Sequence, residues 1–189
     1  NKLSFDDENV IKSAYETGVP MGGDIFAEET DKAPSFLVWT QRDVNGAPLQ
    51  RVQIIKGSIS RADSSPTEKV YDIACSDGLQ VDPSTNRCPD NGARVDIETC
   101  AVSQNVGSAE LKAIWTDPDF NKDDSSFYYV RVLENPTCRW STWDAIRAGF
   151  KPREDLHDTI QDRAWSSPIW YTPENAENPP PIRINAERL

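Results

Sequence analysis

The chain is poor in the residues that hold catalytic metals. Its 189 residues include a single histidine, His157, and four cysteines, none of them in a Cys-x-x-Cys pair. One imidazole cannot supply a multi-histidine metal cluster, and it leaves no choice of base for a Ser-His-Asp triad. His157 stands between Leu156 and Asp158 on a segment predicted to be an exposed helix, where a surface residue is expected rather than a catalytic base. The sequence therefore predicts no catalytic residue in this chain and no cofactor bound by it.

Long apolar runs, a phosphate-binding loop and a basic surface are also missing. No segment approaches the ~20 apolar residues of a membrane span, and no G-x-x-x-x-G-K motif is present. Twenty Lys and Arg stand against 31 Asp and Glu, a net charge of −11. Without such an apolar run we expect no membrane span. Scattered basic residues in such a chain do not assemble a phosphate-neutralising face, so we also expect no nucleic-acid partner. The chain begins at Asn1 without a signal peptide or an initiator Met, which predicts a processed or truncated product.

The four cysteines, Cys75, Cys88, Cys100 and Cys138, form an even set in a polar, loop-containing chain. Such a set is typical of two disulfides formed in an oxidising compartment, so a secreted or periplasmic location is expected. Free thiols and a zinc site are the alternatives, but the spacing does not fit zinc and no histidine is near. Three pairings are possible, and the sequence cannot choose among them. The pairing of sequence neighbours, Cys75 with Cys88 and Cys100 with Cys138, is favoured.

Runs of aromatic and β-branched residues indicate strands over most of the chain. They alternate with turn-rich loops at intervals of about 10 to 20 residues, a pattern that predicts a mainly β fold, an antiparallel β-sandwich of immunoglobulin-like architecture. An Asn45-Gly46 turn between the first two runs predicts a hairpin. The expected strands are residues 36–40, 50–57, 68–75, 94–100, 109–116, 127–133 and 163–173.

Three short helices and an extended tail complete the expected fold. Residues 4–16 resemble a helix that begins with a Ser4/Asp7 capping box and ends at a left-handed Gly18. Helical insertions are predicted at 142–148, between Ser141 and Gly149, and at 155–163. Three prolines at 179–181 predict an extended tail, since they cannot enter a sheet interior. The predicted parts are thus the N-terminal helix and glycine-rich loop (1–34), the β-sandwich (35–173) and the tail (174–189).

One acidic segment has the alternating oxygen ligands of a calcium loop. Asp117, Asp119, Asn121 and Asp123 place carboxylates and an amide at every second position. The segment lacks the glycine at the sixth position and the closing bidentate Glu of an EF-hand. Calcium binding is therefore one hypothesis for these residues, and an acidic turn between strands is the other.

The six tryptophans allow either a packed core or a sugar-binding platform. Indoles inside apolar strand runs are expected in the core. Trp140 and Trp143 leave the strand context, so they are the best candidates for contacts with carbohydrate. Asp24 follows two glycines and is a further candidate for a residue that points into a cleft.

Six stretches of the chain, in the same order, resemble a bacterial family called domain of unknown function 3604 (DUF3604). Together they cover nearly the whole chain, and several long motifs in order make the resemblance specific. They are Gly18-Val-Pro-Met-Gly-Gly-Asp24, Ala33-Pro-Ser-Phe-Leu-Val-Trp39, Arg51-Val-Gln-Ile-Ile-Lys-Gly57, Trp115-Thr-Asp-Pro-Asp-Phe120, Tyr128-Tyr-Val-Arg-Val-Leu133 and Ala164-Trp-Ser-Ser-Pro-Ile-Trp-Tyr-Thr-Pro173.

The resemblance implies a role as one part of a larger hydrolase. Family members look like metal-dependent hydrolases of the polymerase-and-histidinol-phosphatase type, with an N-terminal metal-binding barrel and a β-rich C-terminal part. The His-x-His and Asp-x-His motifs of that barrel have no counterpart here, so the chain resembles the C-terminal part alone. We then expect a non-catalytic sandwich that packs against the barrel of a secreted hydrolase of phosphoryl or related esters, whose divalent metal lies in the barrel. An independent carbohydrate- or ligand-binding module is the alternative.

Overall fold

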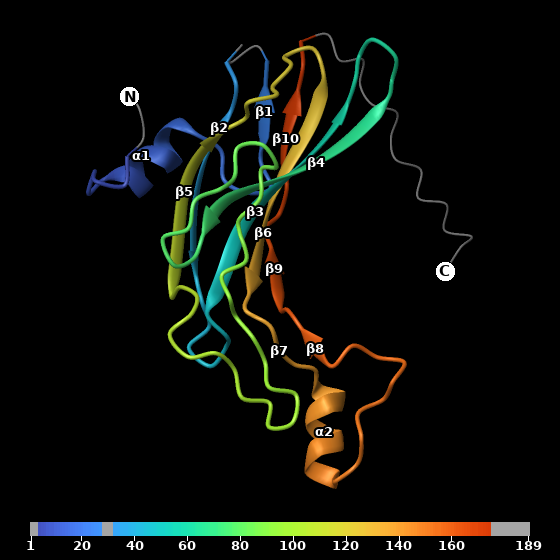
Figure 1. The fold of residues 1–189 in the computed structure, drawn as a ribbon. Coiled ribbons are helices and arrows are strands. Elements are labelled where there is room, and N and C mark those ends of the chain that lie inside the picture. Colours follow the sequence, from blue (N-terminus) through green and yellow to red (C-terminus); the bar gives the residue numbers. More distant parts are fainter. Residues whose placement is uncertain (1–3, 28–31, 175–189) are drawn as a thin grey trace.

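Strands dominate the structure of the chain, which Figure 1 presents as a computed structural model describing residues 4–27 and 32–174. The predicted mainly β class is therefore confirmed, and the predicted tail lies outside the described residues apart from Glu174. The elements in order are α1 (Val10–Thr17), β1 (Asp24–Phe26), β2 (Ser35–Gln41), β3 (Leu49–Ile59), β4 (Pro66–Cys75), β5 (Glu110–Thr116), β6 (Ser125–Glu134), β7 (Thr137–Cys138), α2 (Trp140–Ala148), β8 (Thr159–Ile160), β9 (Arg163–Trp165) and β10 (Ile169–Thr172).

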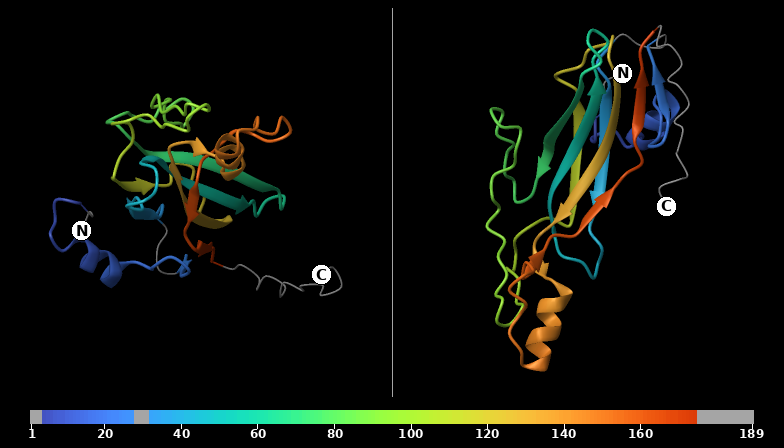
Figure 2. Two further views of the ribbon diagram at one scale, coloured as in Figure 1. Left: turned by 90° about the horizontal axis from the view of Figure 1, so that it is seen from below. Right: turned by 90° about the vertical axis from the view of Figure 1, so that its right-hand side faces the viewer.

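The strands form a larger sheet of order β1-β10-β6-β3-β4, a smaller β2-β5 sheet and a short β7-β8 pair. β9 and β10 pair with successive halves of β6, so they continue one another along its edge. The β2-β5 sheet packs against one face of the larger sheet, while α2 extends below both (Figure 1 and Figure 2, right). With β9 the larger sheet has six strands, and this six-plus-two division differs from the four-plus-three division of an immunoglobulin constant domain. In addition, β1 pairs with β10 in parallel. The immunoglobulin-like detail is therefore not confirmed.

The Asn45-Gly46 turn does not close a hairpin, which corrects the sequence expectation. β2 pairs with β5, whereas β3 pairs with β4 and β6, so the turn carries the chain from one sheet to the other. The end of β6 holds this crossing: Ala47 N donates to Glu134 Oε2 (3.1 Å), and a β-carbon at Gly46 would come within 2.8 Å of Glu134 Oε1. Burial raises the pKa of Glu134. A tertiary contact therefore decides the path where the local turn signal favoured a hairpin.

The register of β3 divides the larger sheet into two faces. Val52 and Ile54, in register with Val132 and Val130, join residues of β2 and β5 in the core. The alternate side chains of β3 project from the opposite face. We call the face that packs on β2 and β5 the inner face and the opposite one the outer face. The main core cluster consists of Phe36, Val38, Leu49, Val52, Ile54, Leu111, Tyr128 and Tyr171.

Two of the predicted helices differ from expectation. α1 begins at Val10, because Ser4 Oγ bonds Asp6 within preceding turns and no capping box with Asp7 forms. Gly18 ends α1 with extended backbone (φ −129°), not left-handed backbone. Residues 155–163 form no helix; Asp158 O instead accepts Arg139 N (2.9 Å) and Thr142 Oγ1 (2.8 Å), which fixes the segment beside α2.

The insertion at α2 is close to expectation, and one predicted strand is missing. α2 begins one residue before Ser141, and Gly149 ends it with the predicted left-handed backbone (φ 72°). Residues 94–100 form only an isolated bridge between Val95 and Val102. The Asp96 side chain accepts both Glu98 N and Thr99 Oγ1, so a local turn replaces the ladder that a strand would need.

Two disulfides hold the long loop between β4 and β5. Cys75 bonds Cys88 and Cys100 bonds Cys138, each with a Cα–Cα distance of 5.6 Å. This is the pairing of sequence neighbours that the sequence favoured. Two structural disulfides indicate an oxidising, non-cytoplasmic location. None of the helices in the described ranges is long and apolar enough to cross a membrane.

Candidate functional site

A polar depression opens between the disulfide-bonded loop and the segment that carries β8 and β9. We call it the basin; its volume is about 340 Å³. One wall comes from the part of the loop between Cys88 and Cys100, so a disulfide anchors each end of that wall. The other wall follows β8, where Thr159 pairs with Cys138. The residues that line the basin are Gln50, Asp90, Ala93, Arg94, Pro136, Thr159, Ile160, Gln161 and Arg163.

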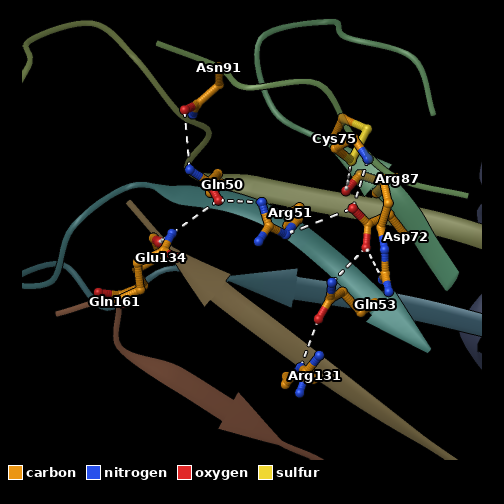
Figure 3. A network of polar contacts seen from close by, with 12 residues as sticks. Gln50, Arg51, Gln53, Asp72, Cys75, Arg87, Asn91, Arg131, Glu134 and Gln161 are labelled. Carbon is orange, nitrogen blue, oxygen red and sulfur yellow. Dashed lines mark hydrogen bonds and ion pairs between the residues drawn. A yellow bond between two sulfur atoms is a disulfide. The ribbon is translucent and has the colours of Figure 1, made fainter. Parts of the chain in front are cut away.

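The side chain of Gln50 is fixed by three hydrogen bonds (Figure 3). Its Oε1 accepts from Arg51 Nη1 (2.7 Å) and from Gln161 Nε2 (3.0 Å), and its Nε2 donates to Asn91 Oδ1 (3.3 Å). Gln161 Nε2 also donates to the backbone oxygen of Glu134 (3.0 Å). The amide at the floor of the basin is therefore ordered by its neighbour Arg51 and by side chains from two other segments, Asn91 of the loop and Gln161.

A buried carboxylate, Asp72, anchors the loop to the outer face beside this floor (Figure 3). Asp72 is 4% exposed and accepts hydrogen bonds from Gln53 Nε2 (2.6 Å) and Cys88 N (2.7 Å). Arg87 Nη1 lies 3.4 Å from Asp72 Oδ1, and Arg51 Nε lies 3.8 Å from Asp72 Oδ2. A buried charge with this many partners is stable, and removal of its partners would be costly.

The same network carries more positive than negative charge. Arg131 Nε donates to Gln53 Oε1 (2.7 Å), so a third guanidinium joins those of Arg51 and Arg87. Arg51 and Arg87 thus pair with the carboxylate of Asp72, Arg131 is linked to it through Gln53, and Arg51 Nε is buried without a hydrogen bond. This local surplus contrasts with a chain whose net charge is −11.

Two further arginines line the basin and differ in their partners. Arg94 donates to Asp90 Oδ1 (3.2 Å) and Oδ2 (2.6 Å). The hydrogen bonds from Arg94 hold the pKa of Asp90 at about 2. Arg163, the first residue of β9, is exposed and forms no ion pair or side-chain hydrogen bond with any described residue. One guanidinium is therefore occupied, and the other is available to a ligand.

Above the basin, the outer face carries a group of exposed apolar side chains. Trp170 is in register with Phe127, and Trp165 is in register with Arg131 four residues further along β6, so both indoles project from this face. Phe127 and Tyr129 stack at 6.3 Å, and Phe127 lies 5.3 Å from Trp170. We call this group the outer aromatic patch. Its exposed members are Phe26 (46%), Ile59 (53%), Trp165 (58%) and Trp170 (47%).

Gly57 gives Phe127 its place in the patch. The two residues are in register across β3 and β6, and a β-carbon at Gly57 would meet the Phe127 ring at 2.2 Å. The ring therefore lies flat over the glycine, where a side chain on β3 would exclude it.

The predicted calcium ligands form a different structure, on the inner face. Asp117 is buried and pairs with Lys56 Nζ (2.6 Å), and its Oδ2 also accepts from Tyr128 OH (2.7 Å). Asp119 pairs with Lys69 (3.0 Å) and accepts a short hydrogen bond from Tyr71 OH. These bonds from Tyr71 and Lys69 lower the pKa of Asp119, whereas burial raises the pKa values of Tyr71 and Tyr128.

The other two predicted ligands make only local contacts, since Asn121 Oδ1 accepts Asp123 N (3.2 Å). Within the described ranges, no group of three or more His, Cys, Asp or Glu residues could hold a metal ion. In the structure the carboxylates of Asp117, which is buried, and of Asp119, which is exposed, both pair with lysines.

The tryptophans are more exposed than the strand pattern predicts. The expectation that strand indoles lie in the core is wrong for Trp39, Trp165 and Trp170, which are 43%, 58% and 47% exposed. Trp140 (70%) and Trp143 (37%) lie three residues apart on α2, and Arg147 packs over the Trp143 ring (5.0 Å).

Asp24 and His157 lie outside the basin. Asp24 is an exposed residue of the edge strand β1, in register with Trp170 and so next to the outer aromatic patch. His157 is exposed, in the segment just before β8. Neither residue lines the basin, so the structure does not bring the predicted candidates together.

Sequence reasoning missed the residues that form the basin. Gln50, Gln161 and Arg163 are isolated polar residues at strand ends, and none belongs to a recognisable motif. The available signal was indirect: two cysteine pairs bracket one polar loop, and such a frame usually holds the loop against another surface. Which surface it meets depends on the order of the strands.

Comparison with known proteins gives a family and nothing finer. Residues 1–173 match the family model described as "Protein of unknown function (DUF3604)". No curated protein and no solved structure gives a significant match to the chain.

Proposed function

The chain belongs to the DUF3604 family, and we propose that it is the non-catalytic, C-terminal β-sandwich of a secreted metal-dependent hydrolase. In this proposal the sandwich docks on a catalytic barrel of the same protein. The barrel supplies the divalent metal and acts on phosphoryl or related esters. In this proposal the barrel carries the sandwich as an immunoglobulin-like module.

The outer aromatic patch is the observation that carries this proposal. Four large apolar side chains are about half exposed on one sheet face, and two of them are tryptophans. Large exposed apolar groups that adjoin one another mark interaction surfaces, and tryptophan is enriched among the residues that dominate binding. The short edge strand β1 borders the same face, so a partner could cover the patch and the sheet edge together.

The donor set of the chain supports a non-catalytic role. Hydrolytic metal centres use several histidines and carboxylates around an open position. The single His157 lies away from the basin, and the carboxylates of Asp117 and Asp119 are bonded to lysines. The two disulfides support secretion, since such bonds persist in oxidising compartments.

Two measurements test the proposal. The intact mass of the native protein should exceed that of this chain by the mass of several hundred residues, which lie on the N-terminal side. A mature protein with the mass of this chain alone would contradict the proposal. Ester hydrolysis should also be absent when the isolated chain is supplied with manganese or zinc. Clear turnover by the chain alone would show that it is an enzyme.

A second candidate function is carbohydrate binding, favoured by the two indoles of α2. Trp140 and Trp143 are i, i+3 neighbours, so they share one side of the helix, and Trp140 is 70% exposed. Aromatic rings presented in this way can stack on sugar rings. A glycan array with the chain and with a Trp140→Ala variant tests this. Binding that survives the substitution would eliminate this site.

A further inference from the structure

We propose that the basin binds a small hydroxylated ligand that carries an oxyanion, such as a sugar with a carboxylate, sulfate or phosphate group. Arg163 pairs with the oxyanion, and Gln161 and Thr159 bind hydroxyl groups of the same ligand. This inference stands apart from the proposed docking role, because it uses the basin and not the outer aromatic patch.

The charge of the basin selects an anion. Arg163 has no partner within the described residues, whereas the guanidinium of Arg94 already faces Asp90. A free guanidinium recognises carboxylate, sulfate and phosphate through two parallel hydrogen bonds. The guanidinium of Arg51, which donates to Gln50 at the floor, adds to the positive potential. No described carboxylate other than that of Asp90 lines the basin.

The neutral polar groups of the basin select hydroxyls. Gln161 directs its Nε2 to Gln50 and to Glu134 O, and no described residue donates to its Oε1. The Thr159 hydroxyl likewise forms no hydrogen bond with a described residue. One acceptor and one group that can donate or accept are thus available beside the cation, which is the complement of a polyol and not of an apolar ligand.

The size and rigidity of the basin suit a ligand of about one sugar ring. Its volume of about 340 Å³ is at the lower end of the range for small-molecule sites, about 300–1,000 Å³. The disulfides at Cys88 and Cys100 fix the loop wall, and Gln50 holds Gln161 in place. Groups that are already ordered lose little entropy when a ligand binds, so a shallow site can still be selective.

Titration of the full 189-residue chain by NMR and calorimetry, at constant ionic strength, tests the proposal. The probes are glucuronate, glucose 6-sulfate and glucose 6-phosphate, with glucose and inorganic phosphate as comparisons. At least one acidic sugar should bind saturably and move the amide signals of residues 159–163 and 93–94. The most strongly bound of the three identifies the acid group. Glucose and inorganic phosphate should each bind at least about tenfold more weakly, since each lacks one half of the ligand.

Two variants with a matched control decide the roles of the side chains. Arg163→Gln should weaken binding of the acidic sugar at least about tenfold, because it removes the charge of an exposed residue. Arg61→Gln removes an exposed arginine outside the basin, on the turn between β3 and β4, and should leave binding unchanged. Thr159→Val should weaken the acidic sugar more than inorganic phosphate. Equal losses in the Arg163 and Arg61 variants, absence of saturable binding, or equal affinity for inorganic phosphate and every acidic sugar would overturn the proposal.

Discussion

The two faces of the larger sheet solve the problem of polar groups in opposite ways. On the inner face, Lys56 and Asp117 have side chains only 6% and 0% exposed, and their charges neutralise each other. On the outer face, Arg163 and the indoles of Trp165 and Trp170 are exposed, and only part of their binding capacity is used. The outer face is closed where the disulfide-bonded loop covers Asp72 and open around Arg163 and the two indoles, where it can meet other molecules. The predictions below test that division, beginning with the largest effect.

Lys56→Met should be the most damaging single substitution of the inner face. It leaves the carboxylate of Asp117 buried with only neutral hydrogen-bond donors, a change that costs about 3–5 kcal/mol of the free energy of unfolding. Urea denaturation followed by tryptophan fluorescence measures this loss.

Lys69→Met is the matched control, because Lys69 pairs with Asp119 in the same cluster but the two side chains are 53% and 47% exposed. An exposed pair contributes about 0–1 kcal/mol, so this variant should remain close to the wild type. Equal losses in the two variants would contradict the distinction between a closed and an open environment.

The disulfides should stabilise the chain in proportion to the loops they close. Removal of Cys100–Cys138, with a sequence separation of 38, should lower the free energy of unfolding by about 4 kcal/mol. Removal of Cys75–Cys88, with a separation of 13, should lower it by about 3 kcal/mol. Denaturation of the two double Cys→Ala variants measures both. A larger loss from the shorter loop would mean that native contacts around Asp72, and not chain entropy, determine the effect.

Gly57→Ala should disturb the outer aromatic patch and cost about 1–3 kcal/mol, since its methyl group needs the space of the Phe127 ring. The paired variant Gly57→Ala/Phe127→Leu should be less destabilised than the sum of the single changes. Denaturation of all four proteins gives the coupling energy. If the losses of the two single variants simply add, the Phe127 ring can move away from the new methyl group without cost.

The smallest predicted effect concerns a single titration at the rim of the basin. Arg94→Ala removes the hydrogen bonds that hold the pKa of Asp90 at about 2, so this pKa should rise towards about 3.9. A depressed carboxylate pKa favours the folded state above the unfolded pKa, and this contribution disappears as the pH falls through about 2. NMR titration of the Asp90 carboxyl carbon follows the change. An unchanged midpoint would show that Arg94 does not contact Asp90 when the protein is in solution.

Local patterns were sufficient to predict most strands but not their partners. The β-branched runs of β3 and β6 correctly indicated strands, and two of the three cysteine pairings were correctly disfavoured. The turn at Asn45-Gly46 has strong hairpin propensity, yet Glu134, far along the chain, holds it between two sheets. The expected helix at 155–163 fails for the same reason, since Asp158 O is taken by Arg139 and Thr142. Contacts between distant residues override local preference in both cases.

The candidate site depended on the same missing information. Alternating oxygens at 117–123 suggested calcium, and only the tertiary structure could show that Lys56 and Lys69 reach those carboxylates. The exposure of Trp165 and Trp170 could not be predicted either. The sequence of a strand rich in aromatic residues is similar whether its sheet is covered on one face or on both.

Hydroxyl-radical footprinting of the native protein tests most directly whether the open face is a docking surface. In the chain alone, Trp165 and Trp170 are 58% and 47% exposed, and Trp140 at 70% serves as an internal reference on α2. Docking of a catalytic portion on the outer aromatic patch predicts that Trp165 and Trp170 are oxidised much more slowly than Trp140. Oxidation of all three indoles in proportion to these exposed fractions would show that nothing covers the face.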